Sequence, residues 1–190
     1  HVTVPIVLGG SGFTIFPAEL MALLKADYGI IGEGERLAAL LDAIENGGDP
    51  AHLPGVILPG GTAVIPRPLS DHPNRKVNGT PAVTDYYVRR GGMLNLQTKR
   101  GCPFRCIYCT YPHIEGRTMR PIAPAEVAAT ALALQEAGAR YLFITDSAFN
   151  ADYRHSLAVA EAFPATDLSI LWGAFFAPTR PPDGYYERLA

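Results

Sequence analysis

The sequence has 190 residues, of which 48% are hydrophobic and 18% are charged, and its formal net charge is −2. This length suits one domain or two partial ones, and the charge balance excludes a basic surface for nucleic acid and a polybasic membrane tether. No apolar run approaches the roughly 20 residues that span a bilayer and no signal-peptide pattern is present, so we expect a cytoplasmic protein.

The first 50 residues alternate apolar strands with helices, and glycine turns end both strands. The expected elements are strand 4–8, helix 17–24, strand 28–31 and helix 35–46. Strand, glycine turn and helix in repetition predict a parallel sheet covered by helices, the C-terminal part of a doubly wound, Rossmann-like domain. Residues 2–8 already have the pattern of a buried strand and residues 183–190 begin a helix, so we expect a piece of a longer chain.

Proline, glycine and polar residues dominate residues 51–92, which we interpret as a linker between domains. Within the linker, the apolar runs 55–58 and 63–65 flank Pro59-Gly60-Gly61, and this arrangement predicts a small hairpin.

A second β/α series begins at Met93 and occupies residues 93–190. Its expected strands are 94–98, 141–145 and 168–175, and its expected helices are 124–137, 151–163 and 183–190. We expect Trp172, in the third strand, to belong to the core. Three β/α units with few charges in their strands fit the first part of a (β/α) barrel, a partial TIM barrel.

All three cysteines lie in one short segment after the first strand of this series: Cys102, Cys106 and Cys109, in the spacing CxxxCxxC. Iron–sulfur clusters take thiolate ligands, and three cysteines leave one iron of a [4Fe–4S] cube open for a substrate. The loop would lie at the carboxyl face, where barrels carry their active sites. The main alternative is a Cys₃His zinc site completed by His113, and a disulfide pairing is a minor one.

The motif resembles the signature of the radical SAM superfamily, because Lys99-Arg100-Gly101 precedes it and the aromatic Tyr108 stands before the last cysteine. The resemblance implies that the three thiolates ligate the cluster and that S-adenosylmethionine (SAM) binds the open iron, with Tyr108 against the adenine. An external electron donor such as flavodoxin or ferredoxin is also implied.

The turn after the second strand of the series departs from that family's pattern. Radical SAM enzymes usually have a glycine-rich, acidic-ended turn there that holds the SAM amino group, whereas this sequence has Thr145-Asp146-Ser147. By the resemblance Asp146, Ser147 and Asn150 would contact SAM; the alternative is that Asp146 or Asn150 caps the following helix.

The order of the front segment resembles the cobalamin-binding subclass of radical SAM proteins. Gly9-Gly10-Ser11-Gly12 and Gly32-Glu33-Gly34 follow neighbouring strands, so the two turns would form one crevice at the edge of a parallel sheet. The resemblance implies that Gly9, Gly10, Gly12, Glu33 and Gly34 contact cobalamin. The alternative is that the glycines serve only the turns.

The resemblance implies an enzyme that uses a [4Fe–4S] cluster and cobalamin to cleave SAM. Its reaction would be methyl transfer or another radical modification of an unactivated carbon in a small-molecule, peptide or lipid substrate. Two alternatives stay open: a radical SAM enzyme whose front domain is a scaffold without cobalamin, and a zinc-stabilised binding module.

Overall fold

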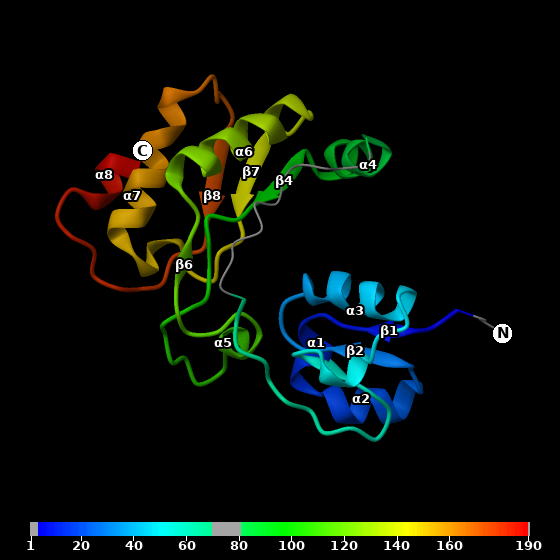
Figure 1. Ribbon diagram of the computed structural model, residues 1–190. Coiled ribbons are helices and arrows are strands. Elements are labelled where there is room, and N and C mark those ends of the chain that lie inside the picture. Colours follow the sequence, from blue (N-terminus) through cyan, green and yellow to red (C-terminus); the bar gives the residue numbers. More distant parts are fainter. Residues whose placement is uncertain (1–3, 70–80, 190) are drawn as a thin grey trace. The chain divides into compact units, whose positions relative to one another are not determined.

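The computed structural model describes residues 4–69 and 81–189, and the chain forms two compact units (Figure 1). The first unit comprises residues 1–70 and 104–117, and the second comprises residues 71–103 and 118–190. Predicted features at residues 1–3, 70–80 and 190 lie outside the described residues. The expected division into domains 1–50, 51–92 and 93–190 stays a prediction.

The first unit is built on a three-stranded sheet in the order β1-β2-β3, with β2 parallel to β1 and antiparallel to β3. Its strands are β1 (Val7–Leu8), β2 (Tyr28–Ile30) and β3 (Val56–Ile57). Its helices are α1 (Ser11–Ile15), α2 (Pro17–Leu24), α3 (Arg36–Glu45), α5 (Tyr111–Ile114) and the 3₁₀ turn η1 (Pro50–His52). Its core consists of Phe13, Met21, Ala26, Ile31 and Ile57.

Two features of this unit differ from the expectation. The predicted hairpin is wrong, because β3 pairs with β2 while residues 63–65 form no strand. Pairing with β2 buries Ile57, whereas Val64 and Ile65 stay exposed. The first strand is also shorter than expected, since Val4 is 65% exposed and only Val7–Leu8 pairs with β2.

The second unit contains a parallel sheet in the order β4-β7-β8, as the β/α pattern predicted. Its strands are β4 (Met93–Leu96), β7 (Tyr141–Ile144) and β8 (Leu171–Ala174), with a separate antiparallel pair β5 (Lys99–Arg100) and β6 (Arg120–Pro121). Its helices are α4 (Pro81–Gly91), α6 (Pro124–Glu136), α7 (Tyr153–Ala162), α8 (Tyr185–Leu189) and the 3₁₀ turns η2 (Phe149–Ala151) and η3 (Phe163–Ala165). Helix α4 lies in the predicted linker and was not expected.

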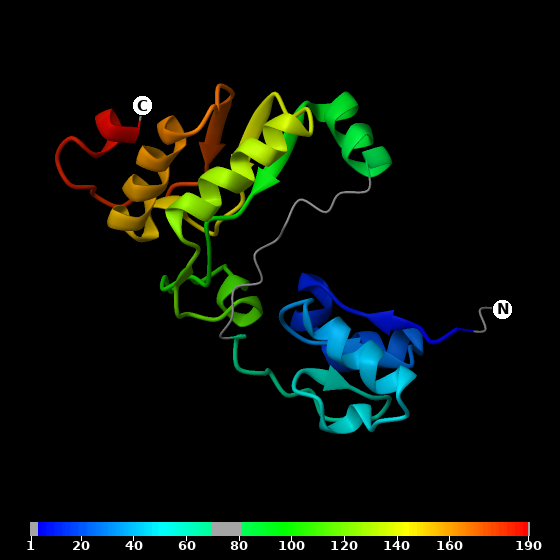
Figure 2. The same cartoon turned by 45° about the horizontal axis from the view of Figure 1, so that its top comes forward.

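Helix α6 covers this sheet, and Figure 2 shows it running along β4. Pro124 opens the helix, where its missing N–H costs nothing, and Gly138, at φ 100°, follows its end. Val127, Ala131 and Leu134 are spaced by four and three residues, so they lie on one face and enter the core. Trp172 packs edge-on against Phe149 and Phe163, which confirms its expected place in the core.

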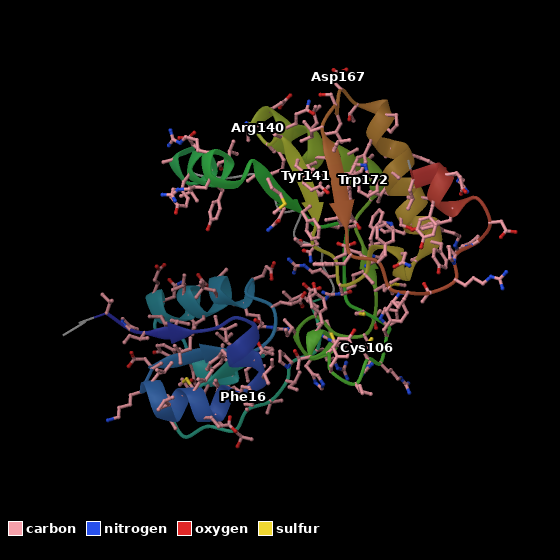
Figure 3. All side chains as sticks on the ribbon, turned by 180° about the vertical axis from the view of Figure 1, so that it is seen from behind. Phe16, Cys106, Arg140, Tyr141, Asp167 and Trp172 are labelled. Carbon is pink, nitrogen blue, oxygen red and sulfur yellow. The ribbon has the colours of Figure 1, made fainter. Side chains whose placement is uncertain are left out.

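The three parallel strands end level with one another, because Leu96 pairs with Ile144 and Ile144 with Ala174. Figure 3 labels Arg140 and Asp167 at the opposite, amino-terminal edge. The residues that follow the strands therefore meet at one carboxyl edge, the edge where open parallel sheets bind ligands. Among the described residues, no helix is long and apolar enough to cross a membrane.

Candidate functional site

The cysteine loop begins directly after β4 and β5 in the chain, as the sequence predicted. All three cysteines are free thiols: Cys102 is buried, Cys109 is partly buried and Cys106 is exposed. By its contacts Cys102 belongs to the second unit, and Cys106 and Cys109 belong to the first. Gly101, at φ 81°, precedes Cys102 and turns the chain in a conformation that favours glycine.

The second half of the loop has its own internal hydrogen bonds. The amide of Cys109 donates to the carbonyl of Cys106 over 3.2 Å, and Arg117 Nη1 donates to the carbonyl of Phe104 over 3.1 Å. Helix α5 of this segment contacts α1. The side chain of Tyr108 is 86% exposed between the two cysteines and is available to a planar ligand.

The three thiols fit the ligand chemistry of an iron–sulfur cluster. Among the described residues, no three His, Cys, Asp or Glu side chains form a group that could hold a metal ion. His113 lies on α5 and likewise completes no such group with described cysteines. Metal binding orders ligand loops, since a preformed site rarely exists without the ion, so the irregular backbone of residues 101–106 suits closure around a cluster.

Asp146 is buried after β7, and its carboxylate is already engaged by the chain. It accepts hydrogen bonds from the amide of Thr98 (2.9 Å), the hydroxyl of Thr98 (2.5 Å) and the amide of Lys99 (3.3 Å). The ammonium of Lys99 lies 3.4 Å from Oδ2 and donates to the carbonyl of Ala148 over 2.6 Å.

Asn150 is buried as well, and it fixes the chain after β8. Its amide nitrogen donates to the carbonyl of Ala177 and to the hydroxyl of Thr179, and its Oδ1 accepts from the amide of Ala177 over 2.7 Å. The alternative that Asp146 or Asn150 caps the next helix is wrong, because Asp152 caps α7 by accepting from the amides of Arg154 and His155.

Ser147, between these two residues, has an unused hydroxyl. Its Oγ is buried and has no hydrogen-bond partner among the described residues. A buried hydroxyl without a partner is unfavourable by about 1–3 kcal/mol, so a hydrogen bond from a ligand bound at this edge would offset that cost.

The two glycine turns of the first unit line one small pocket. Gly9, Gly10 and Gly34 border it, together with Val7, Leu8, Ile30 and Leu37, and its volume is about 170 Å³. A side chain added at Gly10 or Gly34 would meet no atom of the described chain within 4 Å. This volume is below the 300–1,000 Å³ of a complete small-molecule site, so it suits one arm of a large cofactor.

Glu33 and Gly12, also predicted to contact cobalamin, do not border this pocket. Gly12 lies in the first turn of α1. Glu33 is buried and accepts from the amide of Leu69 over 2.6 Å. Beside it Arg36 donates to the carbonyls of Pro54 and Arg67; burial lowers the pKa of its guanidinium, and the charges of Glu33 and Glu35 oppose that shift. Through these hydrogen bonds Glu33 and Arg36 fix the segment 54–69 that follows η1.

Thr98 and Lys99 were missed as site residues. The signal was present, since a lysine directly after an apolar strand is buried only when an acid accompanies it.

No known protein-family profile matches the chain. The chain is 27% identical over 206 aligned positions to the tryptophan 2-C-methyltransferase of Streptomyces laurentii. The alignment covers 80% of this chain and 34% of that protein. It is similar to the structure of the radical SAM methyltransferase TsrM from Kitasatospora setae with tryptophan and a SAM analogue bound (TM-score 0.77, 26% identity, 97% of this chain and 39% of that one).

The chain resembles the cobalamin-binding-domain subclass of radical SAM proteins, and its similarity to these relatives confirms the resemblance predicted from the sequence. A second TsrM structure, with cobalamin and a [4Fe–4S] cluster bound, gives a TM-score of 0.80 at 24% identity over 98% of this chain and 40% of that one. OxsB with aqua-cobalamin bound shares the fold at a TM-score of 0.69 and 18% identity.

These likenesses confirm the predicted fold class. The chain combines part of a Rossmann-like domain, similar to a cobalamin-binding domain, with the first β/α units of a partial barrel of the radical SAM type. It spans about a third of the length of the curated relative and about two fifths of the TsrM chains.

Proposed function

We propose that this chain forms part of a cobalamin-dependent radical SAM enzyme that transfers a methyl group to an unactivated carbon or carries out another radical modification there. The observation that carries the proposal is the set of three free thiols in the spacing CxxxCxxC, in a loop that begins directly after β4 and β5 in the chain. TsrM is a radical SAM methyltransferase and the Streptomyces laurentii relative is a tryptophan 2-C-methyltransferase, which supports the reaction class.

In this proposal Cys102, Cys106 and Cys109 hold a [4Fe–4S] cluster and leave one iron open to SAM. When bound and reduced by a donor such as flavodoxin or ferredoxin, the cluster supplies the electron that breaks a carbon–sulfur bond of SAM and yields a 5′-deoxyadenosyl radical. The loop closes around the cluster because thiolate ligation orders it.

The chain's own groups then bind and orient SAM. The exposed ring of Tyr108 packs against the adenine, and the free hydroxyl of Ser147 takes a polar group of the ligand. Asn150 acts indirectly: it fixes the loop after β8 and so shapes the edge against which SAM lies.

Cobalamin is proposed to enter the pocket bordered by Gly9, Gly10 and Gly34 with one arm. TsrM and OxsB have been solved with cobalamin bound, and the chain shares their fold over this unit. Gly12 and Glu33 support the two turns rather than line the pocket.

The test uses full-length protein purified without oxygen and reconstituted with iron, sulfide and excess hydroxocobalamin. We expect about four irons per chain and a corrin absorption band that survives desalting. Replacement of any one of Cys102, Cys106 and Cys109 by alanine should remove the cluster's absorption and SAM cleavage, whereas His113→Ala should leave both.

Each alternative has its own result. Iron without retained corrin would assign the first unit a scaffold role. Zinc in place of iron, lost in His113→Ala, would establish the Cys₃His site and contradict the proposal.

A further inference from the structure

The carboxylate of Asp146 has no free position for a ligand. A carboxylate has about four lone-pair sites, and here Oδ1 accepts from two backbone amides while Oδ2 meets the Thr98 hydroxyl and the Lys99 ammonium. The side chains of Lys99 and Asp146 are 1% and 0% exposed. The ammonium that this acid binds is therefore supplied by the chain itself.

These contacts fix the backbone immediately before the cysteine loop. Residues 98 and 99 are held by Asp146, the carbonyl of Thr98 accepts from the amide of Ile122 (2.8 Å), and the same carbonyl lies 3.1 Å from Nε2 of His155. Lys99 and Arg100 also pair with β6. The loop thus starts from a segment anchored by β6, α7 and the end of β7.

Cys102 lies three residues beyond Lys99, and three residues of chain span at most about 10 Å. The position of the thiol can therefore vary little once Lys99 is fixed. The side chain of Cys102 is buried, whereas Cys106 is exposed. The anchored segment therefore fixes the position of the first of the three thiols.

We propose that Asp146 is a positioning residue for Cys102, acting through Thr98 and Lys99, and is not a ligand of the SAM amino group. This inference rests on the proposed function in one respect, that Cys102 ligates a cluster. Its geometric part, the placement of the thiol, holds in the protein without metal.

The pair Thr98→Val and Thr98→Ser tests the anchor with little change of volume. Valine removes the hydroxyl bonded to Asp146, and serine retains it. Thr145→Val is the matched control, because the Thr145 hydroxyl at the same edge bonds the carbonyl of Leu96 and not Asp146.

The first readout is the rate at which iodoacetamide labels Cys102 in metal-free full-length protein, followed by mass spectrometry of the peptide that contains it. Labelling of a buried thiol follows the population of the locally opened state. A lost hydrogen bond to a buried charge should raise the rate for Thr98→Val about tenfold. Thr98→Ser and Thr145→Val should stay within about twofold of wild type.

The second readout separates positioning from SAM binding. In reconstituted protein, Thr98→Val and Asp146→Asn should lower the iron content per chain, whereas the fraction that retains its cluster should bind SAM with an unchanged Kd. Should Asp146→Asn fail to fold, which near-ultraviolet circular dichroism would show, the Thr98 pair decides alone.

Two results would overturn the inference: labelling of Cys102 in Thr98→Val at the wild-type rate, or a weakened Kd for SAM in Asp146→Asn with the iron content intact. The failure of the proposed function looks different, since wild-type protein would then take up no iron while the labelling pattern remained.

Discussion

Gly10 and Gly34 border the same pocket, but only at Gly10 does the backbone conformation favour glycine. Gly10 has φ 91°, a conformation in which any other residue is strained, so its replacement would test the turn as much as the pocket. Gly34 has no such constraint, and a side chain built there meets no described atom within 4 Å. Gly34 is therefore the better position at which to fill the pocket.

We predict that Gly34→Leu in the full-length protein lowers corrin retention about tenfold or more, because the side chain occupies the volume proposed for the cofactor. The iron content should not change, and stability should stay within about 0.5 kcal/mol of wild type. Absorbance of the corrin band after desalting, with iron analysis of the same sample, measures both. Gly91→Leu, at an exposed glycine in α4, is the control. Equal retention in the two variants would remove cobalamin from this pocket.

Tyr185 predicts how the second unit responds to alkaline pH. It is buried, and its hydroxyl lies 2.7 Å from Ser156 Oγ. Burial raises the pKa of this phenol, and the hydrogen bond to Ser156 lowers it by less. The phenol therefore loses its proton at lower pH in the unfolded chain than in the folded one. Its contribution to the free energy of unfolding is fully present below about pH 10 and declines as the pH rises further.

Tyr185→Phe should therefore flatten the decline in the denaturation midpoint between pH 9 and 11, at a loss of about 1 kcal/mol at neutral pH from the broken hydrogen bond. Urea titrations across this range measure the slope. Tyr186→Phe, at an exposed neighbour, should keep the wild-type slope. An unchanged slope in Tyr185→Phe would mean that another group governs the alkaline limb.

At the scale of single residues, the sequence predicted where a residue lies in the fold better than it predicted what its side chain contacts. The run of apolar residues 141–144 located the end of β7, and Asp146 and Asn150 do follow it. Their carboxylate and amide groups nevertheless point into the protein, toward Thr98 and Ala177, partners 48 and 27 residues away. The pattern of a strand predicts at which edge of the sheet the next residues lie. It does not reveal which segment, distant in sequence, contacts their side chains there.

At the level of elements, the spacing of apolar residues, with proline or glycine at the helix ends, was sufficient to predict most helices. Pro17 and Pro124 begin α2 and α6 as predicted, since proline is tolerated in the first turn and excluded further on. The hairpin at residues 55–65 failed because two apolar runs beside a turn do not reveal a third strand that competes for pairing. Register against β2, a tertiary contact, decided the outcome.

Gly29, in the middle of β2, shows how closely the first unit is packed. A Cβ at this position would lie 2.2 Å from Phe13 Cζ and 2.7 Å from Ile57 Cγ2, well inside contact distance. Both neighbours belong to the core. The strand can hold its place between them only with no side chain at residue 29.

We predict that Gly29→Ala destabilises the first unit by about 1–3 kcal/mol, because Phe13 and Ile57 must leave their packed positions. Chemical denaturation of the full-length protein, followed by far-ultraviolet circular dichroism, measures the loss. Gly12→Ala, which meets open space in α1, is the control and should be neutral or slightly stabilising. A neutral Gly29→Ala would show that the core of this unit is loosely packed.

Over the whole molecule, the two units have separate cores with no residue in common. The cysteine segment 104–117 belongs to the first unit although residues of the second flank it on both sides in sequence. Within the first unit a Cβ at Gly116 would lie 2.3 Å from Pro68 Cγ, which shows how closely the segment approaches that chain. Chain order alone would assign it to the second unit, as the predicted domain 93–190 does.

Hydrogen exchange should reveal this division. Because distant substitutions without shared partners act independently, Gly29→Ala should speed amide exchange in residues 4–69 and also in residues 104–117, and leave β4, β7 and β8 protected. Leu142→Ala, a truncation in the other core, should speed exchange in those strands and in α6 while residues 104–117 keep their wild-type rates. Mass spectrometry of peptides from the two variants measures both patterns. Exchange in residues 104–117 that follows Leu142→Ala instead would place the second half of the cysteine loop with the barrel strands and contradict the division into these two units.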